Sequence, residues 1–190
     1  LLQIFSPGCF FKNNKLESED CNNIACYSIL QSNSSFLKRT PSLLFGCANL
    51  NIYTGNLTLF NHEEKKQNIH NPVVFDELER FNSIYNPQEI IFIHNYTDKN
   101  KLNEIIKFSG INCNKIHFIN QHEDCEFTQQ AINAENQTYQ EEIMCKFFNI
   151  PDYDSYLQSS TLGERPIALK SLCFLLNFIN DHNSKLTDKI

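Results

Sequence analysis

A short, wholly apolar run at residues 90–93, Ile-Ile-Phe-Ile, constrains the fold of this chain more than any other feature. A run of this length without a polar residue is typical of a β-strand that is covered on both faces. Strands buried in this way usually lie parallel to a neighbour, in sheets with helices on both sides. The run therefore predicts an α/β sheet with helices on both faces.

The chain before residue 61 has the pattern of antiparallel strands. Residues 22–30 are rich in apolar and β-prone side chains and predict a first strand. Residues 43–51 predict a second strand, and residues 56–60 alternate polar and apolar. The Tyr-Thr-Gly-Asn turn at residues 53–56 joins these two strands, so we expect a hairpin.

After residue 61 the apolar pattern changes to helical spacing. Asn71 and Pro72 open a first helix, which Asn86-Pro87 ends. Thr97 and Asp98 cap a second helix, which Gly110 ends. A fifth strand is predicted at residues 115–119.

The rest of the chain is predicted to be mostly helical, with two irregular segments. Residues 120–136 are polar and predict a loop. Thr138 and Glu141 form a capping box at the start of a helix that ends near residue 150. Residues 152–160 predict irregular structure, and the last helix runs over residues 166–180.

The resulting order is three antiparallel strands followed by β/α units. This order predicts a mixed sheet with helices on both faces, and an RNase H-like sheet fits it best. The length of 190 residues and an apolar content of 41% suit one domain with short flanks.

Composition bears on the partners and on the compartment. The net charge is −6 and Lys and Arg are not clustered, which argues against nucleic acid as a direct partner. No apolar run reaches the roughly 18 residues of a membrane helix. The eight Cys residues are scattered, several of them in apolar segments, so we expect an intracellular, reducing compartment.

An RNase H-like sheet raises the question of metal-dependent nuclease activity. Such enzymes hold two metal ions on carboxylates, one of them in the middle of the first strand. None of the five predicted strands contains Asp or Glu. A nuclease with displaced carboxylates, using Asp76, Glu79 or the pair Glu123 and Asp124, remains the alternative.

Three further features bear on the presence of a site. Cys113, His117, His122 and Cys125 are four potential zinc ligands whose spacing matches no structural zinc motif, so they are either a metal site or unrelated strand and loop residues. His94 ends a strand, where a structural role is expected. The five Gly residues are too far apart for a phosphate-binding loop. We predict no catalytic, cofactor-binding or metal-binding residue in this segment.

The last predicted helix is apolar on two faces. A helix of this kind is expected to lie between two layers. One face can cover the sheet, and the other meets either the helix at 138–149 or a neighbouring domain. The first stripe contains Ala168, Leu172, Leu175, Leu176 and Ile179, and the second contains Ile167, Phe174 and Phe178.

Several motifs, taken in order, resemble the connector domain (domain II) of MutS-family DNA mismatch repair proteins. Ser6-Pro7-Gly8 follows a short apolar strand, as at the end of the mismatch-recognition domain in that family. The others are the hairpin glycines and alanine (Gly46, Ala48, Gly55), the Asn-Pro-x-Glu before an apolar strand (Asn86, Pro87, Glu89) and the final helix from Pro166 to Asn180. The abundance of Asn, Ile, Lys and Phe suggests an A+T-rich coding genome. This feature and Cys9 resemble the divergent branch of the family found in large DNA viruses and octocoral mitochondria.

The resemblance implies a division of the chain and a function. Residues 1–8 would end the mismatch-recognition domain, residues 9–160 would form the RNase H-like connector, and residues 161–190 would lead into the core and lever domain. The segment would not be an enzyme and would couple mismatch reading to the levers and the ATPase.

The resemblance also implies the surroundings of the parent protein. That protein would bind ATP, Mg²⁺ and mismatched DNA, would form a dimer, and would dock a MutL-like or nuclease partner. The expected location is the nucleus, a cytoplasmic viral factory or a mitochondrion.

Overall fold

The computed structural model describes residues 22–32, 42–64, 71–113 and 115–187, with side chains up to residue 182. The predicted segment at residues 1–8, with its Ser-Pro-Gly turn, lies outside the described residues.

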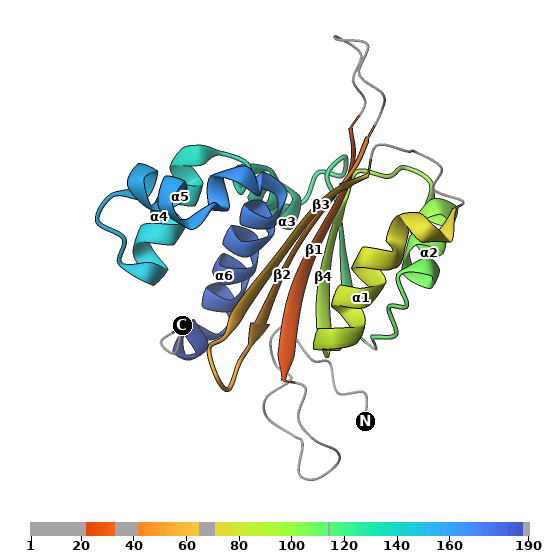
Figure 1. Ribbon diagram of the computed structural model, residues 1–190, viewed down its shortest axis with the longest axis horizontal. Coiled ribbons are helices and arrows are strands. Elements are labelled where there is room, and N and C mark those ends of the chain that lie inside the picture. The colour runs from red at the N-terminus through yellow and green to blue at the C-terminus, as the bar shows by residue number, and fades with distance from the viewer. Residues whose placement is uncertain (1–21, 33–41, 65–70, 114, 188–190) are drawn as a thin grey trace.

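A five-stranded mixed sheet forms the centre of the protein, in the order β3-β2-β1-β4-β5 (Figure 1). Strand β1 pairs antiparallel with β2, and β2 with β3, whereas β1–β4 and β4–β5 are parallel. The strands are β1 (Asn23–Ser32), β2 (Ser42–Asn51), β3 (Leu57–Glu64), β4 (Glu89–His94) and β5 (Ile116–Asn120). The predicted α/β class, with a mixed sheet of antiparallel and parallel strands, is confirmed.

Helices cover both faces of the sheet (Figure 1). One face carries α1 (Asp76–Tyr85), preceded by the 3₁₀ turn η2 (Pro72–Phe75), and α2 (Lys99–Phe108). The other face carries α6 and, beyond it, three shorter helices. The three shorter helices are α3 (Glu126–Asn133), α4 (Gln137–Phe148) and α5 (Tyr153–Ser160). The 3₁₀ turn η3 (Leu162–Glu164) leads from α5 into α6 (Pro166–Thr187).

Three local predictions were wrong. Residues 120–136 contain helix α3, and residues 153–160 form helix α5. Helix α4 begins after Asn136, whose side chain accepts a hydrogen bond from the Thr138 backbone N–H at 3.2 Å, so Thr138 does not cap it. The buried residues of α3 are Thr128 and Ala131, which give too weak an apolar pattern to reveal a helix from sequence.

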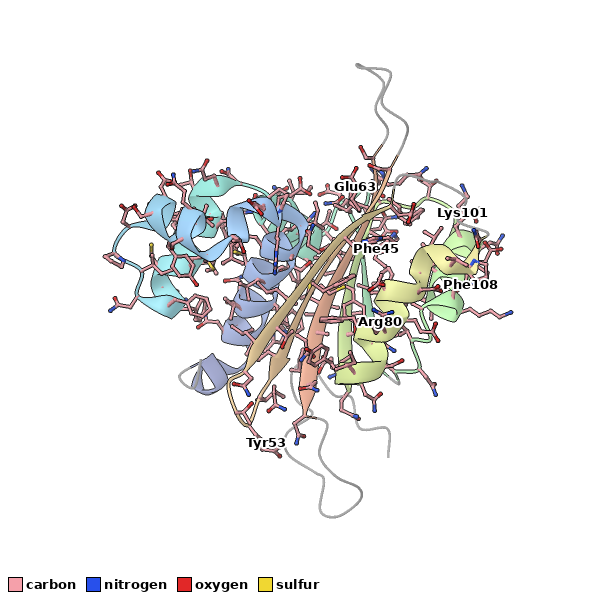
Figure 2. The ribbon with its side chains drawn as sticks, in the orientation of Figure 1. Phe45, Tyr53, Glu63, Arg80, Lys101 and Phe108 are labelled. Carbon is pink, nitrogen blue, oxygen red and sulfur yellow. The ribbon has the colours of Figure 1, made fainter. Side chains whose placement is uncertain are left out.

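The sheet separates two apolar cores because successive side chains of a strand point to opposite faces. On β1, Ala25 and Tyr27 belong to the core under α1 and α2, whereas Ile24 and Cys26 belong to the core under α6. Figure 2 shows Phe45 on the α1 side of the sheet; its ring centroid lies 5.8 Å from that of Phe75, edge to face.

The hairpin between β2 and β3 forms as predicted. Gly55 has a φ of +72°, the left-handed region that favours glycine. The Asn51 side chain accepts hydrogen bonds from the backbone N–H groups of Tyr53 and Thr54, both at 3.1 Å. Tyr53 lies at the tip of the hairpin (Figure 2).

Candidate functional site: the junction of the sheet with helix α6

Helix α6 lies directly on β2 where the strand has no side chain. A Cβ atom on Gly46 would lie 2.2 Å from the carbonyl carbon of Ile167 and 2.4 Å from its oxygen. These are backbone atoms, which a small side-chain rotation cannot move away. Glycine at position 46 therefore permits the backbones of strand and helix to touch.

A buried hydroxyl pair fastens the same contact. Ser171 Oγ lies 2.8 Å from both Ser28 Oγ on β1 and the Gly46 carbonyl oxygen. All three residues are buried. Ser28 occupies the middle of β1, so the centre of the first strand is engaged with α6. Each hydroxyl is satisfied by the other, which offsets the cost of removing it from water.

Strand β3 supplies a cap for the start of α6. The Asn61 side-chain oxygen accepts a hydrogen bond from the Ala168 backbone N–H at 3.2 Å. Pro166, the first residue of the helix, has no N–H to satisfy. The first turn of α6 is therefore held by a strand more than 100 residues earlier in the chain, as the separation of 107 positions shows.

An ion pair joins α6 to the turn between α3 and α4. Lys170 is only 1% exposed, and its ammonium contacts the carboxylate of Glu135, which also accepts from Gln121 Nε2 at 2.9 Å. Burial lowers the pKa of Lys170, and the hydrogen bond and charge of Glu135 oppose this. Burial alone would raise the pKa of Glu135, but Lys170 and Gln121 together lower it. The lowered pKa of Glu135 keeps its carboxylate ionised at neutral pH, beside Lys170.

Buried thiols near this junction are unreactive. Burial raises the pKa of Cys26 to about 12, despite the nearby charge of Lys170, and raises that of Cys173 to about 12. Because the thiolate is the nucleophile and the metal ligand, these two cysteines act as small apolar side chains.

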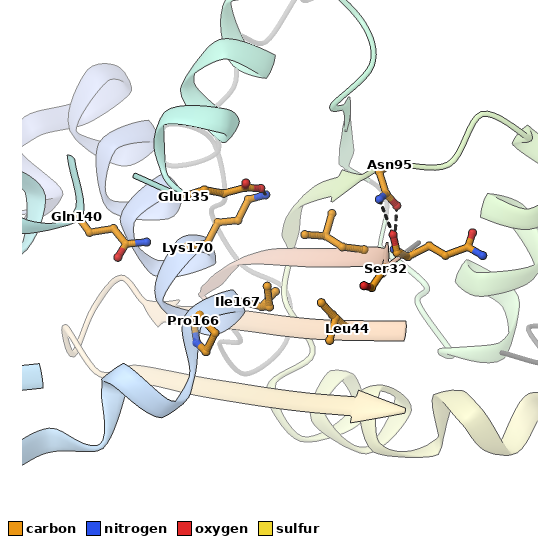
Figure 3. A pocket seen from close by; sticks show the side chains of 10 residues that line it. Ser32, Leu44, Asn95, Glu135, Gln140, Pro166, Ile167 and Lys170 are labelled. Atoms are coloured by element: carbon orange, nitrogen blue, oxygen red, sulfur yellow. Dashed lines mark hydrogen bonds and ion pairs between the residues drawn. The ribbon is translucent and has the colours of Figure 1, made fainter. Parts of the chain in front are cut away.

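A pocket of about 360 Å³ lies at the carboxyl ends of β1 and β4, beside the start of α6 (Figure 3). Lys170 and Glu135 meet on one side of it, and Asn95 lies on the other. Asn95 bonds both backbone groups of Gln31 at 2.9 Å, which prolongs the pairing of the two strands. The wall contains Leu30, Gln31, Ser32, Leu44, Asn95, Glu135, Gln140, Pro166, Ile167 and Lys170.

The two apolar stripes of α6 are both covered by this chain. Leu172, Leu175 and Leu176 are 2% exposed or less, in the core between α6 and the sheet. On the second stripe, the Phe178 ring centroid lies 6.1 Å from that of Phe127 on α3. Ile167, predicted to belong to the second stripe, instead lies against Gly46 of the sheet.

The prediction that the strands contain no carboxylate was wrong, because two strands are longer than the sequence suggested. Strand β3 ends in Glu63 and Glu64, and β4 begins with Glu89, whose residue exposure is 0%. Glu89 Oε1 lies 3.0 Å from Lys115 Nζ and 2.8 Å from His117 Nε2. Burial alone would raise the pKa of Glu89, but bonds to His117 and Lys115 lower it. The Glu89 carboxylate is thus paired with Lys115 and His117 of this chain.

The four potential zinc ligands have separate surroundings. Cys113 Sγ lies 3.0 Å from the Gln88 carbonyl oxygen, His117 pairs with Glu89, and Cys125 Sγ lies 3.0 Å from Thr128 Oγ1. His122 lies in the turn after β5, where its backbone N–H donates to Asn120 Oδ1 at 3.1 Å. In the part of the chain that the structure describes, no three His, Cys, Asp or Glu side chains are grouped to hold one metal ion.

The other candidate residues are also dispersed. Asp76 and Glu79 lie on α1, whereas Glu123 and Asp124 lie in the turn after β5. His94 is 5% exposed, and its Nδ1 accepts a hydrogen bond from the Tyr96 backbone N–H at 3.3 Å. The structural role expected for His94 agrees with this bond.

Comparison with known proteins does not indicate a function for this chain. No protein-family model matches this chain, and no curated protein is significantly similar to it in sequence. Within the described ranges, none of the helices combines the length and apolar character needed to cross a bilayer.

Proposed function

We propose that this chain is a non-catalytic connector segment of a MutS-like DNA mismatch repair ATPase. It would couple the mismatch-reading domain to the lever and ATPase domains and offer a surface to a MutL-like or nuclease partner. ATP, Mg²⁺ and mismatched DNA would bind to other parts of a dimeric parent protein in a reducing compartment.

The observation that carries the proposal is the direct seating of α6 on the sheet. The Gly46–Ile167 backbone contact, the Ser28–Ser171 pair and the Asn61 cap hold the helix and the strands as one body. A close-packed interior deforms little, so a displacement of the sheet would move the 22-residue helix with it. A coupling segment needs this mechanical property.

The use of the first strand also supports coupling over nuclease chemistry. At the middle of β1, where a metal nuclease would need a carboxylate, the side chains serve packing: Ser28 bonds to Ser171, and Tyr27 Oη donates to Asn82 Oδ1 at 3.2 Å. A fold alone does not define an activity, so the support for coupling comes from these side chains and not from the fold.

The first test compares the 190-residue chain with the longer product of its gene. We expect the 190-residue chain neither to hydrolyse ATP nor to cleave DNA, and the longer protein to hydrolyse ATP at a rate that a single-mismatch duplex changes. Cleavage of DNA by the 190-residue chain with Mg²⁺ or Mn²⁺, lost on changing Asp76, Glu79 or Glu123 with Asp124, would instead establish the nuclease alternative.

The second test addresses the junction itself in the longer protein. Asn61→Ala removes the bond from β3 to the first turn of α6, at a cost of about 1 kcal/mol. We expect the response to mismatched DNA to fall at least about threefold, within the usual range of coupling energies, with DNA-independent ATP hydrolysis unchanged. An unchanged response would contradict coupling through this junction.

A further inference from the structure

The two edge strands of the sheet, β3 and β5, differ in how they are protected from pairing with another chain. Strand β3 ends in Glu63 and Glu64 and is bound to α6 through Asn61. Strand β5 has the sequence Ile-His-Phe-Ile-Asn, with no Asp, Glu, Lys, Arg or Pro. Charges and prolines are the usual means of keeping an edge from pairing with another chain, so β5 lacks the protection that β3 has.

The backbone of β5 presents hydrogen-bonding groups outward. The Lys115 carbonyl accepts from the Ile90 N–H, and the Gln121 N–H donates to the His94 carbonyl, so odd-numbered residues face β4. Alternation along the strand then directs the N–H and C=O groups of Ile116 and Phe118 away from β4. Of the strands that the structure describes, none lies beyond β5.

Exposed aromatic rings flank this edge. Phe118 is 47% exposed, and its ring centroid lies 5.7 Å from that of Phe92 on the neighbouring strand. Phe127, on α3 at the other face, is 37% exposed. An added strand could cover both rings while pairing with the backbone between them, as in β-strand addition.

Charge at one end of β5 indicates the partner. Glu123, Asp124 and Glu126 are exposed in the turn and helix start that follow the strand. None of these three carboxylates has an ion-pair partner among residues 22–32, 42–64, 71–113 and 115–182. A cationic segment would complement them.

We propose that the outer edge of β5 binds an extended segment of a partner protein, in which alternating apolar residues are preceded by Lys or Arg. The segment pairs with the backbone of Ile116 and Phe118 and places its basic end beside Glu123, Asp124 and Glu126. This site does not depend on the function proposed above, and it is tested on the 190-residue chain.

The test uses two matched fluorescent peptides, Arg-Arg-Val-Thr-Val-Thr-Val and Glu-Glu-Val-Thr-Val-Thr-Val, in fluorescence anisotropy titrations at low salt. We expect the basic peptide to bind with a dissociation constant on the order of 10 µM and the acidic peptide at least about tenfold more weakly. Bound peptide should slow hydrogen exchange of the Ile116 and Phe118 amides while leaving those of β3 unchanged.

Variants separate the backbone, the ring and the charge. Phe118→Pro removes an outward N–H, which an edge strand tolerates, and should abolish binding. Phe118→Ser keeps that N–H and loses only the ring, so binding should weaken about tenfold or less. Glu123→Gln combined with Asp124→Asn and Glu126→Gln should make the two peptides bind equally. Thermal unfolding of each variant confirms that it is folded.

Three results would overturn the proposal. One is absence of binding of the basic peptide to the wild-type chain at 1 mM, on the order of the weakest specific affinities. Another is exchange protection at sites other than β5. The third is a wild-type dimer that Phe118→Pro makes monomeric, because a second copy of the chain would then be the occupant of this edge.

Discussion

Single residues at the junction have effects larger than their size suggests. Gly46 has no side chain, yet any other residue there would meet the backbone of Ile167. Lys170 is almost completely buried, and its charge is tolerated because Glu135 lies beside it. Both residues matter because of what α6 brings against them.

Gly46→Ala should lower the free energy of unfolding by about 3 kcal/mol, since the added methyl group can be accommodated only by moving α6 away from β2. Urea denaturation measures this change. Gly163→Ala is the matched control, because its added Cβ would lie 3.8 Å from the nearest atom, an ordinary contact, and should change stability by about 0.5 kcal/mol or less. Equal stabilities of the two variants would contradict the close contact.

Glu135→Gln should destabilise the protein by about 2 kcal/mol at pH 7, because it leaves the buried Lys170 ammonium without its counter-charge. Lys170→Met removes that charge and should change stability by about 1 kcal/mol or less. The pKa of Lys170 already lies below its usual 10.5 and would fall further without Glu135. The folded variant then binds fewer protons than the unfolded chain, so its stability should rise with pH up to about 10.5.

At the scale of elements, the contact between β4 and β5 is electrostatic as well as apolar. Glu89 begins β4, and its two partners, Lys115 and His117, come from the residue before β5 and from β5 itself. The carboxylate is buried, and its contacts with Lys115 and His117 hold the two parallel strands together.

Acid should weaken this contact. Glu89 has its pKa lowered from 4.5 in the folded chain, so the carboxylate contributes stability above about pH 4.5, and this contribution is lost as pH falls through the folded pKa. Glu89→Gln should cost about 3 kcal/mol at neutral pH and nothing at the lowest pH. Glu77→Gln, on the exposed surface of α1, is the control and should leave the curve of unfolding free energy against pH unchanged.

At the scale of the whole molecule, the sheet is a shared wall between two cores, with β1 and β4 buried on both faces and β5 at an edge. Residues of α6 form much of one core, and α1 and α2 much of the other. Both cores depend on the same strands, so we expect them to unfold together.

Native-state hydrogen exchange should follow this arrangement. Backbone amides of β1 and β4 should exchange only on global unfolding, and those of Ile116 and Phe118 on β5 should exchange several orders of magnitude faster. Nuclear magnetic resonance measures both sets in one experiment. Fast exchange in β1 would contradict a single cooperative unit.

Local signals in the sequence determined the five strands, the hairpin at Gly55 and the caps at Asn71 and Asp98, since each depends on neighbours within a few positions. The resemblance to a mismatch-repair connector supplied the proposed function, which stays a prediction. Helices α3 and α5, the position of Ile167 against Gly46, and the grouping of Glu89 with Lys115 and His117 were decided only by the tertiary structure. These features either join residues that are distant in the chain or bury small and polar side chains. In both cases the sequence shows no periodic apolar pattern that would reveal them.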